Sequence, residues 1–232
     1  MAHIKVVRRS MRPEEYIELR YIKLKGYVYD EIREISPVYI REARQTSEMH
    51  YEFYDEEYRE LNIGELYYTP DGSAFIKCCV TIPEELKGRD VYLYTKTSSE
   101  MTVKVNGKYA GGVDPNRQRI LISPYAQNGR CEIEILGYNR SKPDDERNPE
   151  TLAVRGCRQT FEGLFLATVD EDVQNLCYDC ELLWDVIASE AFNEDYREFV
   201  IRELNSALNL IDFDDIKNEA VKKAIKYIDE NI

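Results

Sequence analysis

The sequence has no apolar run long enough to cross a membrane, and its longest hydrophobic stretches have only the length of a β-strand. A membrane-spanning helix needs roughly 20 consecutive apolar residues. The first residues, MAHIKVVRRSMRPEEY, also lack the apolar core of a secretory signal. These two absences argue against a membrane partner and predict a soluble, cytoplasmic protein.

Basic residues are scarce relative to acidic ones: the chain has 31 Lys and Arg against 44 Asp and Glu, with a formal net charge of −13. An acidic protein repels phosphate backbones, so nucleic acid is not expected as a partner. A Gly-rich phosphate loop and a GxSxG turn are both absent. Carboxylate pairs such as Glu84-Glu85 could act as acid and base on a glycosidic bond, yet turns and exposed faces explain them better. No catalytic residue and no metal ligand is predicted.

Cysteine is sparse, with six residues in the chain, and two of the six are adjacent. This distribution is unlike a disulfide framework, so free and mostly buried thiols are expected. Cys177 and Cys180 form a CxxC, but they lie in a helical pattern with no second CxxC and no nearby histidine. A zinc or redox site there is therefore the weaker hypothesis.

Three regions differ in their hydrophobic period, which predicts domains at 1–61, 62–170 and 171–232. The first region is rich in tyrosine and charge, and its apolar residues recur at roughly helical spacing up to Ser36-Pro37. Two helices or one kinked helix fit this spacing. The residues that carry it are Tyr16, Leu19, Ile22, Val28, Ile32 and Ile35.

In the second region the period changes to two, and short strands alternate with turn formers such as Asn106-Gly107. Seven or eight strands of this kind predict a sandwich or a barrel. In the third region the period returns to 3.6 and predicts three helices, with Asn193 as a cap and Trp184 as a core anchor. The predicted fold class is mainly β with α: a jelly-roll, galactose-binding-like β-sandwich preceded by N-terminal helices and followed by a three-helix segment.

The stretch LCYDCELLWDVIASEAFNEDYREFVIRELNSALNLIDFDD resembles the helical segment that precedes the catalytic domain in family 38 α-mannosidases of the cytosolic and bacterial type. Upstream, the strand from Phe75 to Gly88 and the hairpin from Val103 to Asp114 resemble that family's N-terminal sandwich. The resemblance covers about residues 62–229 and depends on the order and spacing of short motifs. The matching helical positions are Tyr178, Asp179, Glu181, Leu183, Asp185, Arg197, Leu204, Asn205, Ala207, Asn209, Ile211 and Asp212.

The resemblance implies a parent enzyme that is a retaining α-mannosidase, in which zinc or another divalent metal holds the mannose ring while an aspartate attacks. That metal is bound through a His-x-Asp-x-x-Trp motif in the catalytic domain. His3 and His50 are the two histidines of this chain, and neither begins His-x-Asp. The chain is therefore expected to be a non-catalytic N-terminal fragment that needs no cofactor itself. Its expected role is to dock onto a downstream catalytic domain and to support a homo-oligomer in mannoside breakdown.

A carbohydrate-binding module and a free-standing interaction domain are the alternatives. Sugar binding would use stacking aromatics and polar side chains in the loops at one end of the sandwich, although aspartate and asparagine are also ordinary turn formers. The candidate sugar-binding residues are Asp114, Asn116, Arg117, Tyr125, Tyr138, Asn139 and Arg140. The charged, proline-containing segment from Asn139 to Gln159 is expected to be a long loop that reaches another domain.

Overall fold

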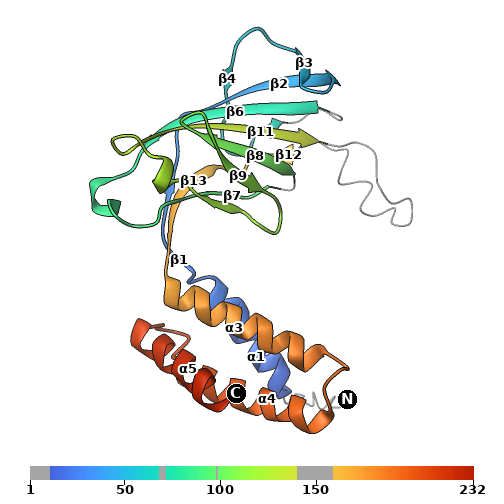
Figure 1. The fold of residues 1–232 in the computed structure, drawn as a ribbon, viewed down its shortest axis with the longest axis vertical. Helices are drawn as coiled ribbons and strands as arrows, with labels where there is room; N and C mark the ends of the chain where they lie inside the picture. The colour runs from blue at the N-terminus through green and yellow to red at the C-terminus, as the bar shows by residue number, and fades with distance from the viewer. Residues whose placement is uncertain (1–10, 68–71, 98, 140–158) are drawn as a thin grey trace, which may run out of the picture. The chain divides into compact units, whose positions relative to one another are not determined.

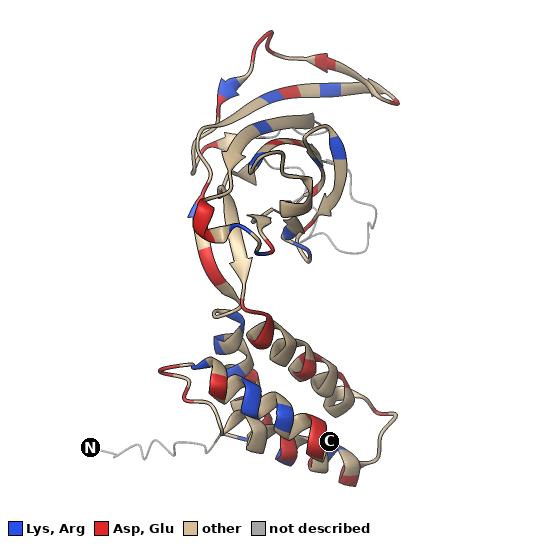
Figure 2. Cartoon of the chain, turned by 60° about the vertical axis from the view of Figure 1, so that its left-hand side comes forward, with Lys and Arg blue, Asp and Glu red and all other residues tan. Residues whose placement is uncertain are grey.

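The computed structural model describes residues 11–67, 72–97, 99–139 and 159–232 (Figure 1). The chain divides into two compact units, a helical unit of Met1–Asp30 with Val169–Ile232 and a strand unit of Glu31–Thr168. Acidic positions occur on both units (Figure 2). No helix among the described residues has the length and apolar character needed to span a bilayer. The domain boundaries placed after residues 61 and 170 stay predictions.

The helical unit contains α1 (Pro13–Lys25), α3 (Glu171–Ala188), α4 (Glu194–Leu208) and α5 (Asn218–Asn231). Two of these helices begin at capped residues, since Asp170 Oδ1 accepts the Val173 N–H at 3.0 Å and Asn193 Oδ1 accepts the Tyr196 N–H at 2.8 Å. The three predicted C-terminal helices and the Asn193 cap are thereby confirmed.

The apolar stripes of the four helices meet in one core. Ile17 and Leu24 of α1 are buried there with Leu176 of α3 and Leu204 of α4. Trp184 packs partly buried against the same core, as its register in α3 predicts. Helix α1, which comes before the strand unit, therefore packs with helices that come after it.

The prediction that two helices, or one kinked helix, extend to Ser36 is wrong beyond Lys25. After α1 the chain forms β1 (Tyr29–Glu34), β2 (Val38–Ser47), β3 (His50–Phe53) and β4 (Arg59–Glu60). The apolar spacing of this region mimics a helix, but burial in β1 alternates with period two between partly buried and exposed residues. Tyrosine, which is frequent in this region, also favours strands.

The larger sheet has the order β3-β2-β6-β11-β8-β9, with β4 paired to β2. Its remaining strands are β6 (Gly72–Thr81), β8 (Glu100–Val105), β9 (Lys108–Val113) and β11 (Arg130–Asn139). In β8 burial follows strict alternation, and the predicted turn at Asn106-Gly107, where both residues have positive φ, joins β8 to β9 in an antiparallel hairpin.

A four-stranded sheet has the order β1-β13-β7-β10, with β7 (Tyr92–Thr95), β10 (Arg119–Leu121) and β13 (Leu164–Val169). Strands β5 (Leu66–Tyr67) and β12 (Gln159–Thr160) form a separate pair, and two short 3-10 helices, η1 (Glu84–Leu86) and η2 (Ser123–Tyr125), lie between strands.

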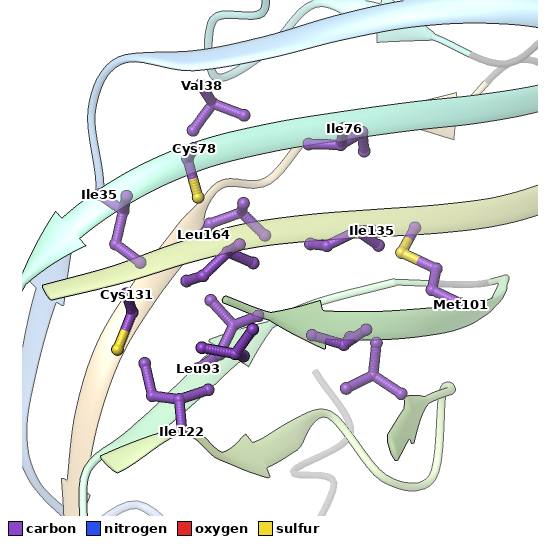
Figure 3. Packing of buried hydrophobic residues seen from close by; sticks show 14 of the residues in the cluster. Ile35, Val38, Ile76, Cys78, Leu93, Met101, Ile122, Cys131, Ile135 and Leu164 are labelled. Carbon is purple, nitrogen blue, oxygen red and sulfur yellow. The ribbon is translucent and has the colours of Figure 1, made fainter. Parts of the chain in front are cut away.

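One core cluster draws side chains from both of the main sheets, including Ile135 of β11, Leu93 of β7 and Leu164 of β13 (Figure 3). The unit is thus an antiparallel, sandwich-like β-structure, while the jelly-roll topology stays a prediction. Most of the long loop expected over residues 139–159 lies outside the described residues.

We expect Leu204→Ala to lower the free energy of unfolding of the helical unit by about 2–5 kcal/mol, because the buried side chain leaves a cavity. Trp184 is the only tryptophan and lies in this unit, so urea unfolding followed by its fluorescence reports on the helices. Leu182→Ala is the control: this side chain is 67% exposed, and its loss should cost less than about 0.5 kcal/mol. Equal losses in the two variants would contradict the packing described.

Candidate functional site

Three of the predicted sugar-binding residues form one tight turn after β9. Asp114 Oδ1 accepts the backbone N–H groups of Asn116 at 2.8 Å and Arg117 at 2.9 Å. The Arg117 guanidinium binds Asp114 Oδ2 at 2.9 Å. The N–H of Asn116, followed by the contacts from Arg117, lowers the pKa of Asp114. These carboxylate oxygens therefore serve the turn itself, as the turn-former interpretation requires.

The strand register brings Tyr138 to the same end of the sheet as this turn. Tyr138 lies opposite Glu100, and the neighbouring Met101 lies opposite Val113, the residue before Asp114. Tyr138 is 42% exposed and Asn139 ends β11, while Arg140 lies outside the described residues.

Tyr125 lies at the other end of the same strands. Its backbone carbonyl accepts a hydrogen bond at 2.8 Å from the Asn106 side chain, and Asn106 is in the turn that follows β8. The Tyr125 ring packs partly buried against the core. The strand register therefore places Tyr138, Asn139 and the Asp114 turn, but not Tyr125, at one end of the sheet, and sugar binding by this set stays a prediction.

The five described cysteines are free. Cys78 and Cys131 lie in the core of the strand unit, and Cys177 and Cys180 lie in the core of the helical unit. Burial is the main cause that raises the pKa of Cys131 to about 11 and the pKa of the other three to about 12. Among the described residues, no group of three or more His, Cys, Asp or Glu side chains has a geometry that fits a metal ion.

A pocket of about 300 Å³ lies between α1 and α3 in the helical unit. Apolar side chains form much of its wall, and three carboxylates, all on exposed residues, line it as well. The lining residues are Ile17, Glu18, Tyr21, Ile22, Cys180, Glu181, Trp184 and Asp185. We call this feature the α1–α3 pocket.

A polar contact joins the two helices beside this pocket. The Tyr21 hydroxyl donates a hydrogen bond to Glu181 Oε1, and Lys25 Nζ lies 4.0 Å from the same oxygen. Partial burial, followed by the interaction with Glu181, raises the pKa of Tyr21 well above its usual range. Tyr21 is therefore a neutral donor at physiological pH, and it holds Glu181 at the pocket wall.

Several residues that match the family 38 motif make structural contacts within the helical unit. Asn205 Oδ1 accepts a hydrogen bond from Arg20 at 3.3 Å, and Asn205 Nδ2 donates to the Pro13 carbonyl at 3.3 Å, so this residue joins α4 to α1. Asp212 Oδ1 accepts the Asp214 N–H at 3.0 Å after α4 ends. These motif positions are therefore accounted for by folding of the unit.

A second, open pocket of about 410 Å³ lies on the larger sheet and is lined by Tyr39, Glu57, Tyr58 and Lys77. Lys77 Nζ lies 3.8 Å from the centre of the Tyr58 ring. Neither pocket was predicted from the sequence. The sequence did contain a signal for the second pocket. Val38 and Ile40 alternate with Tyr39 and Arg41, and this alternation places Tyr39 and Arg41 on the face of the sheet opposite the core.

No family model and no curated protein matches this chain. Solved structures resemble part of it. A β-glucuronidase from Bacteroides uniformis matches with a TM-score of 0.40 and 12% identity over 59% of this chain and 18% of its own. A putative β-galactosidase from Bacteroides fragilis matches with a TM-score of 0.40 and 16% identity over 60% of this chain and 23% of its own.

A rhamnosidase from a Novosphingobium species matches with a TM-score of 0.40 and 16% identity, over 60% of this chain and 15% of its own. The chain thus spans less than a quarter of each of these three proteins. None of the three is an α-mannosidase, and similarity at this level assigns neither a family nor an activity.

We expect Cys79, which is exposed, to react with the thiol reagent DTNB at neutral pH well before the four buried cysteines, whose raised pKa values leave little thiolate. The measurement is the absorbance time course of a Cys157→Ser variant, which removes the cysteine outside the described residues. Adding Cys79→Ser should abolish the fast phase, and denaturant should release the slow thiols. A fast reaction of Cys177 or Cys180 would contradict their burial and would support a redox-active site formed by these two cysteines.

Proposed function

We propose that this chain is a non-catalytic N-terminal module of a retaining, zinc-dependent α-mannosidase of family 38, where it docks onto the catalytic domain and supports the oligomer. The ordered motif resemblance over about residues 62–229 supports the choice of parent. The arrangement of a sandwich-like unit and a helical unit agrees with the N-terminal sandwich and helical segment that the resemblance implies.

The α1–α3 pocket is the observation that carries the docking role. Ile22 is 58% exposed at this pocket, and Trp184 contributes a half-buried indole. Exposed apolar surface bordered by polar residues is typical of interaction sites. Because Glu18 and Asp185 are also at the pocket, the catalytic domain would fit it best with an apolar side chain flanked by lysine or arginine.

The carboxylates of the helical unit favour this structural role over catalysis. Glu181 is held by Tyr21 and Lys25. Burial and the nearby Asp229 raise the pKa of Asp179. A raised pKa is typical of a carboxyl group that acts as a general acid. However, neither Asp179 nor Asp229 lines either of the two pockets described. The described residues also offer no donor set for the zinc of the family, so this metal would belong to the catalytic domain.

A carbohydrate-binding module is the second candidate. The exposed Tyr138 and the Asp114 turn lie at the same end of the sheet, and this favours it, because aromatic and polar side chains at one end of a sandwich are the groups that a sugar site would use. A free-standing interaction domain would present the α1–α3 pocket to a separate protein. In each case we propose a cytoplasmic location.

The first test of this proposal is an assay of the purified 232-residue chain with an aryl α-mannoside. We expect no hydrolysis, with or without added zinc, because the zinc ligands and the nucleophile are expected in another domain. Release of the aryl group is the measurement. The coding sequence that follows Ile232 should contain a His-x-Asp-x-x-Trp motif. Turnover by the chain alone, or a coding sequence without that motif, would overturn the assignment.

The docking role makes a prediction for Ile22→Lys. In the 232-residue chain this change should alter the free energy of unfolding by less than about 0.5 kcal/mol, because the side chain is exposed. In the proposed full-length α-mannosidase, Ile22→Lys should shorten the half-life of activity on heating, because it places a charge in the apolar interface between the α1–α3 pocket and the catalytic domain. Leu182→Lys, on an exposed α3 residue outside the pocket, is the matched control. Identical half-lives for the two variants would remove the docking role while leaving the family assignment intact.

A further inference from the structure

The outer face of the larger sheet carries an unusual set of side chains. Along β2 and β6 the residues that alternate with the buried ones are Tyr39 and Arg41, and Phe75 and Lys77. The segment from β3 to β4 adds further aromatic rings above them, and this segment is part of the tyrosine-rich region. The structural role of the module does not require this face.

One part of the face is filled by aromatic packing. The Phe75 ring lies 4.9 Å from Tyr51 and 5.1 Å from Phe53, measured between centroids. The Arg41 guanidinium stacks over Phe53 at 3.7 Å. These contacts hold β3 against the sheet. The chain that follows β3 continues in the same direction and pairs again with β2 through β4, and Glu57 and Tyr58 of this connection line a second position.

That second position is the pocket of Tyr39, Glu57, Tyr58 and Lys77, which we call the outer-face pocket. Tyr39 lies directly opposite Lys77 in the register of β2 and β6, and Glu134 of β11 follows on the other side of Lys77. Tyr39 is 36% exposed, while the Lys77 amine lies over the Tyr58 ring at 3.8 Å. The pocket therefore presents aromatic surface and charged groups within a volume of about 410 Å³.

The charges decide which ligand fits. Within the described part of the chain, neither the Glu57 carboxylate nor the Lys77 amine takes part in an ion pair. Each of these groups can therefore form a hydrogen bond with a ligand. Glu57 and the neighbouring Glu134 disfavour an anionic ligand, and Lys77 disfavours a cationic one. A neutral ligand rich in hydroxyl groups satisfies both, because a hydroxyl donates to a carboxylate and accepts from an ammonium group.

We propose that the outer-face pocket binds a neutral carbohydrate. The Tyr39 ring contacts the apolar C–H face of one sugar unit, and Glu57 and Lys77 bind its hydroxyl groups. The openness of the site to solvent suits an oligosaccharide lying across the sheet. This site goes beyond the proposed structural role and does not depend on the identity of the parent enzyme. It is distinct from the Asp114 turn, which follows β9 at the far edge of the same sheet.

The test is a titration of the isotope-labelled 232-residue chain with α-mannotriose, maltotetraose and cellotetraose, followed by amide chemical shifts. We expect saturable shifts around Tyr39, Tyr58 and Lys77 with at least one of these sugars. Tyr39→Ala should weaken that binding at least about tenfold. Glu57→Gln, in an exposed loop where no folding defect is expected, should weaken it severalfold. Tyr109→Ala, on an exposed tyrosine of β9, is the control and should leave the affinity unchanged.

Two results would overturn the proposal. One is the absence of saturable shifts at this pocket with all three sugars while the spectrum remains that of a folded protein. The other is a set of shifts centred on the Asp114 turn and Tyr138, with affinity unaffected by Tyr39→Ala and Glu57→Gln, which would place sugar binding at the end of the sheet instead.

Discussion

The burial of Ile17 and Leu24 is the interaction that joins α1 to the core of the helical unit. Helix α1 has only 13 residues, and an isolated helix of this length is marginal in water. It becomes stable by packing against α3 and α4. Polar contacts that include those from Tyr21 to Glu181 and from Asn205 to Pro13 fix where it lies. Without α1, the core residues of α3 and α4 that it covers would face water.

The same helix also creates the proposed docking surface. Its apolar residues are not confined to one side, since Ile17 is buried in the core and Ile22 is largely exposed at the α1–α3 pocket. A helix that only completed a core would carry polar residues at such positions. The stability of this unit and its proposed docking role therefore depend on neighbouring residues of one short helix.

The fold was predictable from the sequence where burial follows a single period over a long segment. In α3 the stripe through Leu176, Cys180 and Ile187 lies in the core, and Asn193 caps the next helix as expected. Between Val28 and Ile35 the chance spacing of apolar residues suggested a helix, although Ile32 is 49% exposed. The strands there are stabilised by pairing with distant strands, a long-range effect that local spacing does not contain.

The candidate sites were less predictable for the same reason. The Asp114 turn was recognisable because its residues are adjacent in the sequence. Tyr21 and Glu181 are 160 positions apart, and nothing local indicates that they meet. Tyr39 and Lys77 belong to strands whose register appears only once the sheet is formed. Short-range chemistry could thus be predicted, whereas both pockets required the three-dimensional arrangement.

The strand unit lies between α1 and α3 in the sequence, and this order affects how the protein folds during synthesis on the ribosome. Helix α1 leaves the exit tunnel before the strand unit, and α3 and α4 emerge only after the whole strand unit, Glu31–Thr168, has been made. Until then Ile17 and Leu24 lack the core side chains of α3 and α4 that bury them, and apolar segments exposed in this way are prone to aggregation. The strand unit can form its own core during this interval. The helical unit is therefore completed only after the strand unit has been synthesised.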